Sequence, residues 1–107
     1  MIDERLIQQV ARKIVEQVRP EKVVLFGSWA WGEPDADSDL DLLIICDSTL
    51  RRDKRAREIL RLFSARKFPL DVLVYTPQEV EMCRRMKGSF VRYILDHGKV
   101  LYERTTS

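Results

Sequence analysis

Residues 22–46, KVVLFGSWAWGEPDADSDLDLLIIC, contain two apolar runs separated by a loop rich in glycine, serine and aspartate. The first run, residues 22–26, is β-branched and aromatic and ends at Gly27, which predicts a buried strand followed by a tight turn. The second run, residues 40–46, is nearly all aliphatic, as is typical of a central strand covered on both faces. The end of the first strand and the start of the second must approach each other, which favours an antiparallel pair.

The remaining segments alternate between helical and extended patterns. Apolar residues recur at helical spacing over residues 2–18 and 52–66, residues 28–32 suit one or two helical turns, and residues 70–75 predict a third strand. Thr76, Pro77 and Glu79 predict a capped helix start, residues 89–97 a last helix, and residues 99–103 an edge strand or an ordered tail. This order predicts one α/β domain over residues 1–107, with helices covering one face of a small mixed β-sheet.

Composition limits the kinds of function. The 107 residues are 45% hydrophobic and 34% charged, which is enough for a modest core, and the net charge is only +2. A basic run over residues 51–67 is most simply a solvated helix face, so direct binding of nucleic acid is not favoured. No apolar run reaches the roughly 20 residues that span a bilayer. Cys46 and Cys83 have no metal or redox spacing, so we expect a cytoplasmic protein without a membrane partner.

Three aspartates suggest a metal site. Asp39 and Asp41 are separated by one residue at the start of the second strand, so the pleat directs both carboxylates to the same face. Asp71 has the equivalent early position in the third strand and joins them if the two strands are parallel neighbours. Clustered carboxylates repel one another, and hard oxygen ligands suit Mg²⁺. Each feature alone is weak, because a lone Asp-x-Asp is more often a turn feature.

A phosphate-binding turn is expected nearby. Gly27 and Ser28 follow the first strand and open a short helix, where backbone N–H groups can hold an anion. Gly-Ser after a strand is more often an ordinary turn, but its combination with three strand-borne aspartates is improbable by accident. An anion cradle beside a metal cluster suits in-line attack on the α-phosphate of a nucleoside triphosphate, with two metals sharing the carboxylates.

The two motifs, GSWAWG at residues 27–32 and SDLDLLI at residues 38–44, resemble the signature of the polymerase-beta-like nucleotidyltransferase superfamily. Length and element order resemble its minimal branch, the MNT antitoxins. The resemblance implies that Gly27, Ser28 and Ser38 contact ATP and that Asp39, Asp41 and Asp71 are the catalytic, Mg²⁺-binding carboxylates. It also implies a HEPN-type toxin as partner, with AMP transferred to a tyrosine hydroxyl of that toxin. Asp71 is then the candidate general base.

Two positions in the first motif depart from the family pattern. Trp29 and Trp31 stand where the family usually has arginines. On a short helix, residues two apart point to nearly opposite sides, so we expect one tryptophan in the core. The other is open to two interpretations, a base-stacking group or an anchor for a partner.

Alternatives to transfer to a toxin remain. A non-catalytic nucleotide-binding antitoxin that neutralises its partner by covering it is the main one, and antibiotic nucleotidyl transfer is weaker, because such enzymes generally need a further domain. Without an obvious second domain, the acceptor must come from a partner protein or from a second copy of the chain. The base preference, the acceptor residue, the number of AMP groups and the oligomeric state are not determined by the sequence.

Overall fold

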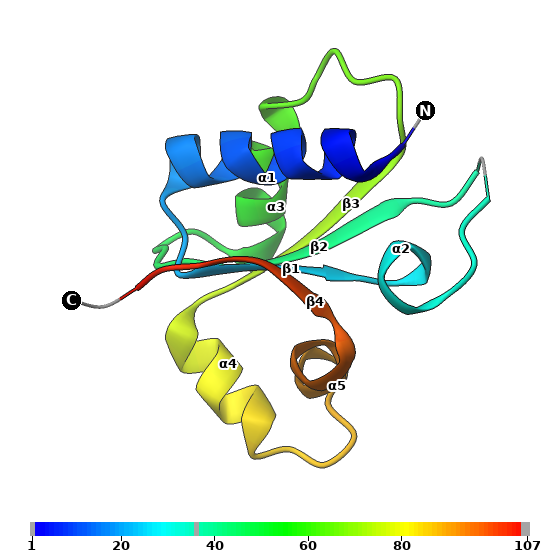
Figure 1. The fold of residues 1–107 in the computed structure, drawn as a ribbon. Coiled ribbons are helices and arrows are strands. Elements are labelled where there is room, and N and C mark those ends of the chain that lie inside the picture. The colour runs from blue at the N-terminus through cyan, green and yellow to red at the C-terminus, as the bar shows by residue number, and fades with distance from the viewer. Residues whose placement is uncertain (1, 36, 106–107) are drawn as a thin grey trace.

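The computed structural model describes residues 2–35 and 37–105. Over these residues the elements follow the predicted order (Figure 1). Their bounds are α1 (Glu4–Val18), β1 (Lys22–Phe26), α2 (Ser28–Trp31), β2 (Leu40–Ile45), α3 (Arg52–Arg61), β3 (Leu70–Tyr75), α4 (Pro77–Arg84), α5 (Phe90–His97) and β4 (Lys99–Glu103).

The sheet is mixed, as predicted, with the strand order β3-β2-β1-β4. β1 is antiparallel to both of its neighbours, β2 and β4, so the predicted antiparallel pair and the predicted edge strand are both confirmed. β2 and β3 are parallel, and α3 lies on the connection between them, because parallel neighbours need a long crossover.

Helices cover both faces of the sheet, with α1 and α3 on one side and α4 and α5 on the other (Figure 1). Alternate residues of β2 supply the two cores, since Leu42 packs with the α1 and α3 side and Leu43 packs with the α4 and α5 side. The prediction that helices cover one face is therefore wrong, and the prediction that β2 is covered on both faces is confirmed. An aliphatic strand needs apolar cover on each side.

The predicted capping box opens α4. The N–H of Glu79 donates to the Thr76 hydroxyl at 3.2 Å, and the N–H of Thr76 donates to the Glu79 carboxylate at 2.8 Å. The second long helix is shorter than predicted, because α3 ends at Arg61 and gives way to tighter turns, with the N–H of Leu62 donating to the carbonyl three residues earlier.

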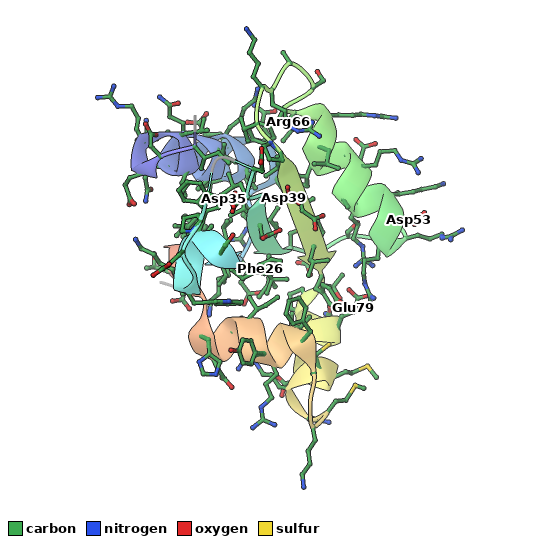
Figure 2. The ribbon with its side chains drawn as sticks, turned by 90° about the vertical axis from the view of Figure 1, so that its right-hand side faces the viewer. Phe26, Asp35, Asp39, Asp53, Arg66 and Glu79 are labelled. Atoms are coloured by element: carbon green, nitrogen blue, oxygen red, sulfur yellow. The ribbon has the colours of Figure 1, made fainter. Side chains whose placement is uncertain are left out.

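A partly buried ion pair joins helices from opposite faces of the sheet. Arg55 of α3 lies with Nη1 2.6 Å from Oε1 of Glu79, and the same Nη1 also donates to the carbonyl of Val74 at 3.3 Å. Figure 2 labels Glu79 where α4 approaches the lower end of α3. The pair therefore fixes α4 against the end of β3. Over residues 2–35 and 37–105, no helix is both long and apolar enough to cross a membrane.

Candidate active site

Three aspartates lie at one end of the sheet. Asp41, near the start of β2, stands opposite Phe26 of β1 on one side and Asp71 of β3 on the other. Asp39 precedes Asp41 by two residues and lies just ahead of Leu40, the first residue of β2. Figure 2 labels Asp39 and Phe26 at this end of the sheet. Asp41 is half-buried, and the other two carboxylates are exposed. The parallel pairing of β2 and β3 brings Asp71 beside Asp41, as its position in the sequence required.

The negative charge of Asp41 is unfavourable in this arrangement. Burial, followed by the charges of Asp71 and Asp39, raises the pKa of Asp41 from 3.8 to about 6. A hard divalent cation would offset this repulsion, so the chemistry of the donor set fits Mg²⁺. Among the described residues, however, no three acidic, histidine or cysteine side chains converge closely enough to hold a metal ion. The carboxylates would have to rotate toward a common point, and their role as metal ligands stays a prediction.

The Gly27 turn lies directly against Asp41. Gly27 has φ +77° and ψ −157°, a conformation that essentially only glycine adopts. A Cβ added there would lie 2.2 Å from Oδ2 of Asp41, so only the bare backbone leaves room for the carboxylate. The Gly27 carbonyl accepts from the N–H groups of Ala30 and Trp31 at 3.0 and 3.1 Å, which closes α2. The first N–H groups of a helix have no intrahelical acceptor, so the start of α2 at Ser28 suits an anion beside the carboxylates.

Ser38 has local hydrogen bonds that the sequence did not indicate. Its hydroxyl accepts from the N–H of Asp35 at 2.9 Å and donates to the Asp35 carboxylate at 3.2 Å. Its carbonyl accepts from Nε1 of Trp29 at 3.3 Å. These contacts give Ser38 a structural role in the loop that precedes Asp39, and its predicted contact with a nucleotide stays a prediction.

The two tryptophans point to different surroundings, as expected for residues two apart. Trp29 is half-buried and packs against the core beneath α1 and α3, which confirms the core interpretation for one of them. Trp31 is 42% exposed, and its ring lies 6.4 Å from the ring of Phe26 and 5.4 Å from that of Tyr93, measured between centroids. Trp31 therefore belongs to the surface beside the carboxylates.

Sequence reasoning missed the contribution of α5 to this surface. Two rings of this helix are open to solvent, since Tyr93 is 49% exposed and Phe90 is 55% exposed. Phe90 packs edge-on against Phe26 at 5.6 Å, and Tyr93 packs against His97 at 4.3 Å. The spacing of Phe90, Tyr93 and His97 at positions i, i+3 and i+7 of one helix was the available signal.

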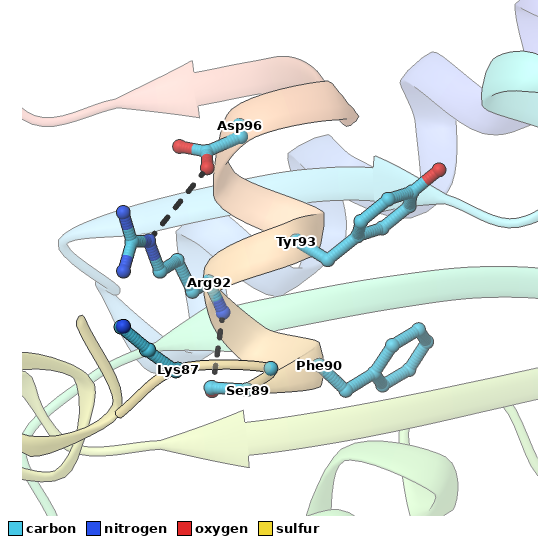
Figure 3. A pocket seen from close by; sticks show the side chains of 7 residues that line it. Lys87, Ser89, Phe90, Arg92, Tyr93 and Asp96 are labelled. Carbon is cyan, nitrogen blue, oxygen red and sulfur yellow. Dashed lines mark hydrogen bonds and ion pairs between the residues drawn. The ribbon is translucent and has the colours of Figure 1, made fainter. Parts of the chain in front are cut away.

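Lys87 is a cation in the loop that precedes α5. It lines a hollow of about 550 Å³ together with Phe90 and Tyr93 (Figure 3). Arg84 instead lines a separate hollow with Glu21 and Glu103, close to the other end of β1. Lys87 therefore shares the hollow with Phe90 and Tyr93 but lies on the opposite side of α5 (Figure 3).

A glycine turn after the first strand, with acidic residues near the adjacent starts of the next two strands, defines a nucleotidyltransferase-type α/β fold. The sequence model of the family described as polymerase beta, nucleotidyltransferase matches residues 8–107. The chain belongs to this family and is a nucleotidyltransferase.

Similar proteins agree with this assignment. A protein of Methanocaldococcus jannaschii, named as a candidate protein adenylyltransferase, is 27% identical over 106 residues, which cover 95% of this chain and all of the relative. Two crystal structures share the fold at 19% identity. One is the toxin–antitoxin pair MntA–HepT in a mutant form, with a TM-score of 0.57 over 97% of this chain and 76% of the other. The second is a toxin–antitoxin with AMP-PNP, with a TM-score of 0.53 over 92% and 74%.

Proposed function

We propose that this protein transfers AMP from ATP to a hydroxyl group of a partner protein, and that the partner is a HEPN-type toxin modified on a tyrosine in the cytoplasm. The observation that carries the proposal is the contact between the Gly27 backbone and the carboxylate of Asp41, with Asp71 on the adjacent strand. A phosphate held at this turn would lie against the carboxylates. The name of the M. jannaschii relative supports transfer to a protein, and the toxin–antitoxin structures, one of them with AMP-PNP, support a nucleotide and a toxin as partners.

The residues suggest a division of roles. The Gly27 turn and the N–H groups at the start of α2, from Ser28 onward, would hold the triphosphate. Ser38, in the loop before Asp39, would also contact the nucleotide. Asp39, Asp41 and Asp71 would hold Mg²⁺, which when bound neutralises the developing phosphate charge. Burial, together with the charges of Asp71 and Asp39, raises the pKa of Asp41, and a cation held by the three carboxylates would offset both effects.

The reaction is a substitution at the α-phosphorus. The acceptor oxygen attacks in line, and a new bond forms between that oxygen and the α-phosphorus. The bond from the α-phosphorus to the oxygen bridging to the β-phosphorus breaks, and pyrophosphate leaves with the electron pair. The proton of the acceptor hydroxyl passes to a carboxylate, for which we assign Asp71, because it is the exposed member beside Asp41.

Modification of a toxin would account for antitoxin activity. AMP attached to a tyrosine adds a phosphodiester charge and the bulk of a nucleoside. If the tyrosine lies near the toxin's RNA site, both effects oppose entry of an RNA phosphate. The partner would present its hydroxyl to the exposed carboxylates of Asp39 and Asp71.

Non-catalytic binding is the second candidate function, and Trp31 favours it. The family usually has an arginine here, and the exposed ring of Trp31 offers a protein contact instead of a charge for the triphosphate. In that case the protein would neutralise its toxin by covering it.

Transfer of label from ATP labelled in the α-phosphate separates the two functions. The protein encoded beside this chain is co-expressed with it, and label in that partner is compared for wild type, for Asp39→Asn combined with Asp41→Asn, and for Asp71→Asn. We expect label with wild type only, while all variants keep the fold and the complex. A stable complex without label in the wild type would favour the binding module. Near-normal labelling by Asp71→Asn would refute its role as base.

A further inference from the structure

Three exposed aromatic rings form one surface beside the candidate active site. We call Trp31, Phe90 and Tyr93 the aromatic surface; they are 42%, 55% and 49% exposed. Phe26 lies beneath them and contacts both Trp31 and Phe90. The rings come from α2 and α5, two elements far apart in the sequence, so the fold assembles this surface.

The aromatic surface is continuous with the expected phosphate turn. Phe26, on which the surface rests, immediately precedes Gly27 and pairs with Asp41 in the sheet. The N–H of Trp31 donates to the carbonyl of Gly27 at 3.1 Å, so Trp31 is one helical turn from the glycine. A group attached to a phosphate bound at Gly27 could therefore contact the aromatic surface while the phosphate stays at the turn.

The geometry of the rings suits a flat ligand. Trp31 and Tyr93 are perpendicular, with 90° between their planes, so the edge of one meets the face of the other and ring area remains open. Figure 3 shows Phe90 and Tyr93 projecting from the same side of α5, next to a hollow of about 550 Å³. The residues that line this hollow include Phe90 and Tyr93 but not Trp31, so the hollow adjoins one edge of the aromatic surface.

We propose that the aromatic surface binds the base of the nucleoside triphosphate by stacking. The inference rests on the proposed function, because it takes the triphosphate to bind at Gly27. A base joined through its ribose to the α-phosphate is the occupant that the continuity with the turn favours over a partner's side chain. Arg92 and Asp96, which also line the hollow, form an ion pair with each other at 4.0 Å. Stacking tolerates any base, so ATP and GTP should bind with similar affinity. Purines should bind better than pyrimidines because their rings are larger and stack more strongly.

Calorimetric titration with Mg²⁺ present tests the proposal, using ATP and inorganic tripolyphosphate as the two probes. Tripolyphosphate has the phosphates without the base. The test variant combines Trp31→Leu with Tyr93→Leu, and Tyr93→Phe is the matched control that keeps the ring. We expect wild type and Tyr93→Phe to bind ATP with similar affinity. The double variant should bind ATP roughly tenfold more weakly and tripolyphosphate as wild type does.

Three outcomes would overturn the inference. Wild type could bind ATP no more tightly than tripolyphosphate, or the double variant could lose affinity for both probes equally, as a misfolded site would. The double variant could also keep its ATP affinity while losing its complex with the partner protein, which would make the aromatic surface a protein interface. Ring-dependent ATP binding without AMP transfer by wild type would sustain this inference and refute the proposed function.

Discussion

Gly27→Ala is expected to remove most of the transfer activity at a modest cost in stability. At φ +77° and ψ −157°, an alanine is strained by about 1–3 kcal/mol. Its Cβ would lie 2.2 Å from Oδ2 of Asp41, well inside the 3.4 Å at which ordinary contact begins. The carboxylate is the end of a rotatable side chain, so it can swing away cheaply, but the predicted metal ligand is then displaced. A displacement of about 1 Å in a catalytic site lowers the rate on the order of 100-fold.

Gly88→Ala is the matched control for backbone strain. Gly88 also has φ +77°, but no atom lies within 4 Å of the Cβ that alanine would add. Urea unfolding should give similar losses of about 1–3 kcal/mol for the two variants. Labelling of the partner with AMP should fall on the order of 100-fold for Gly27→Ala. Folded Gly27→Ala with near wild-type transfer would refute the reasoning. A far larger loss of stability than in Gly88→Ala would show that the Asp41 carboxylate cannot rotate away from the added methyl group.

Two further predictions concern carboxylates with shifted pKa values. The pKa of Asp41 is raised from 3.8 to about 6, so the stability that its proton contributes is lost as the pH rises through 6. In EDTA, the free energy of unfolding of Asp41→Asn should exceed that of wild type by about 1–2 kcal/mol near pH 8 and equal it near pH 3.5. Mg²⁺ should reduce the difference near pH 8. The hydrogen bond from Arg55, above all, lowers the pKa of Glu79 from 4.5 to about 2, so its contribution is present above 4.5 and lost as the pH falls toward 2. Glu79→Gln keeps an acceptor for the N–H of Thr76. It should lower the free energy of unfolding by about 1–2 kcal/mol near pH 7 and by less near pH 3. Equal losses at the two pH values in urea unfolding would contradict this.

Most of the fold could be predicted because local signals agreed with the tertiary structure. The turn at Gly27, the aliphatic run of β2 and the capping box of Thr76 and Glu79 each specify an element by short-range chemistry. The placement of α4 and α5 was harder to predict, because an amphipathic helix shows that it has a buried face and not which side of the sheet covers it. The ion pair between Arg55 and Glu79, which holds α4 at the end of β3, joins residues 24 apart in the chain.

The candidate site was predictable where it depends on strand register. Asp41 and Asp71 meet because two strands of known apolar pattern are parallel neighbours. The aromatic surface was predictable only in part. The spacing of Phe90 and Tyr93 places them on one face of α5, but the assembled surface depends on how α5 packs against β1 and α2. Nothing within residues 89–97 predicts that Phe90 will contact Phe26, because a contact between elements far apart in the sequence leaves no local pattern.

The positions of Trp29 and Trp31 explain how one short helix serves both stability and the site. Trp29 points to the core and donates to the carbonyl of Ser38, which ties the loop before Asp39 to α2. Trp31 points outward over Phe26. An arginine at position 29 would need a partner for its charge in the half-buried place that the indole occupies, whereas the indole needs one acceptor and has it. The chain thus has ring surface, instead of two cations, beside the expected phosphates. Screening by salt weakens contacts between charges and leaves stacking largely intact, so nucleotide binding here should depend less on ionic strength than it would with arginines at both positions.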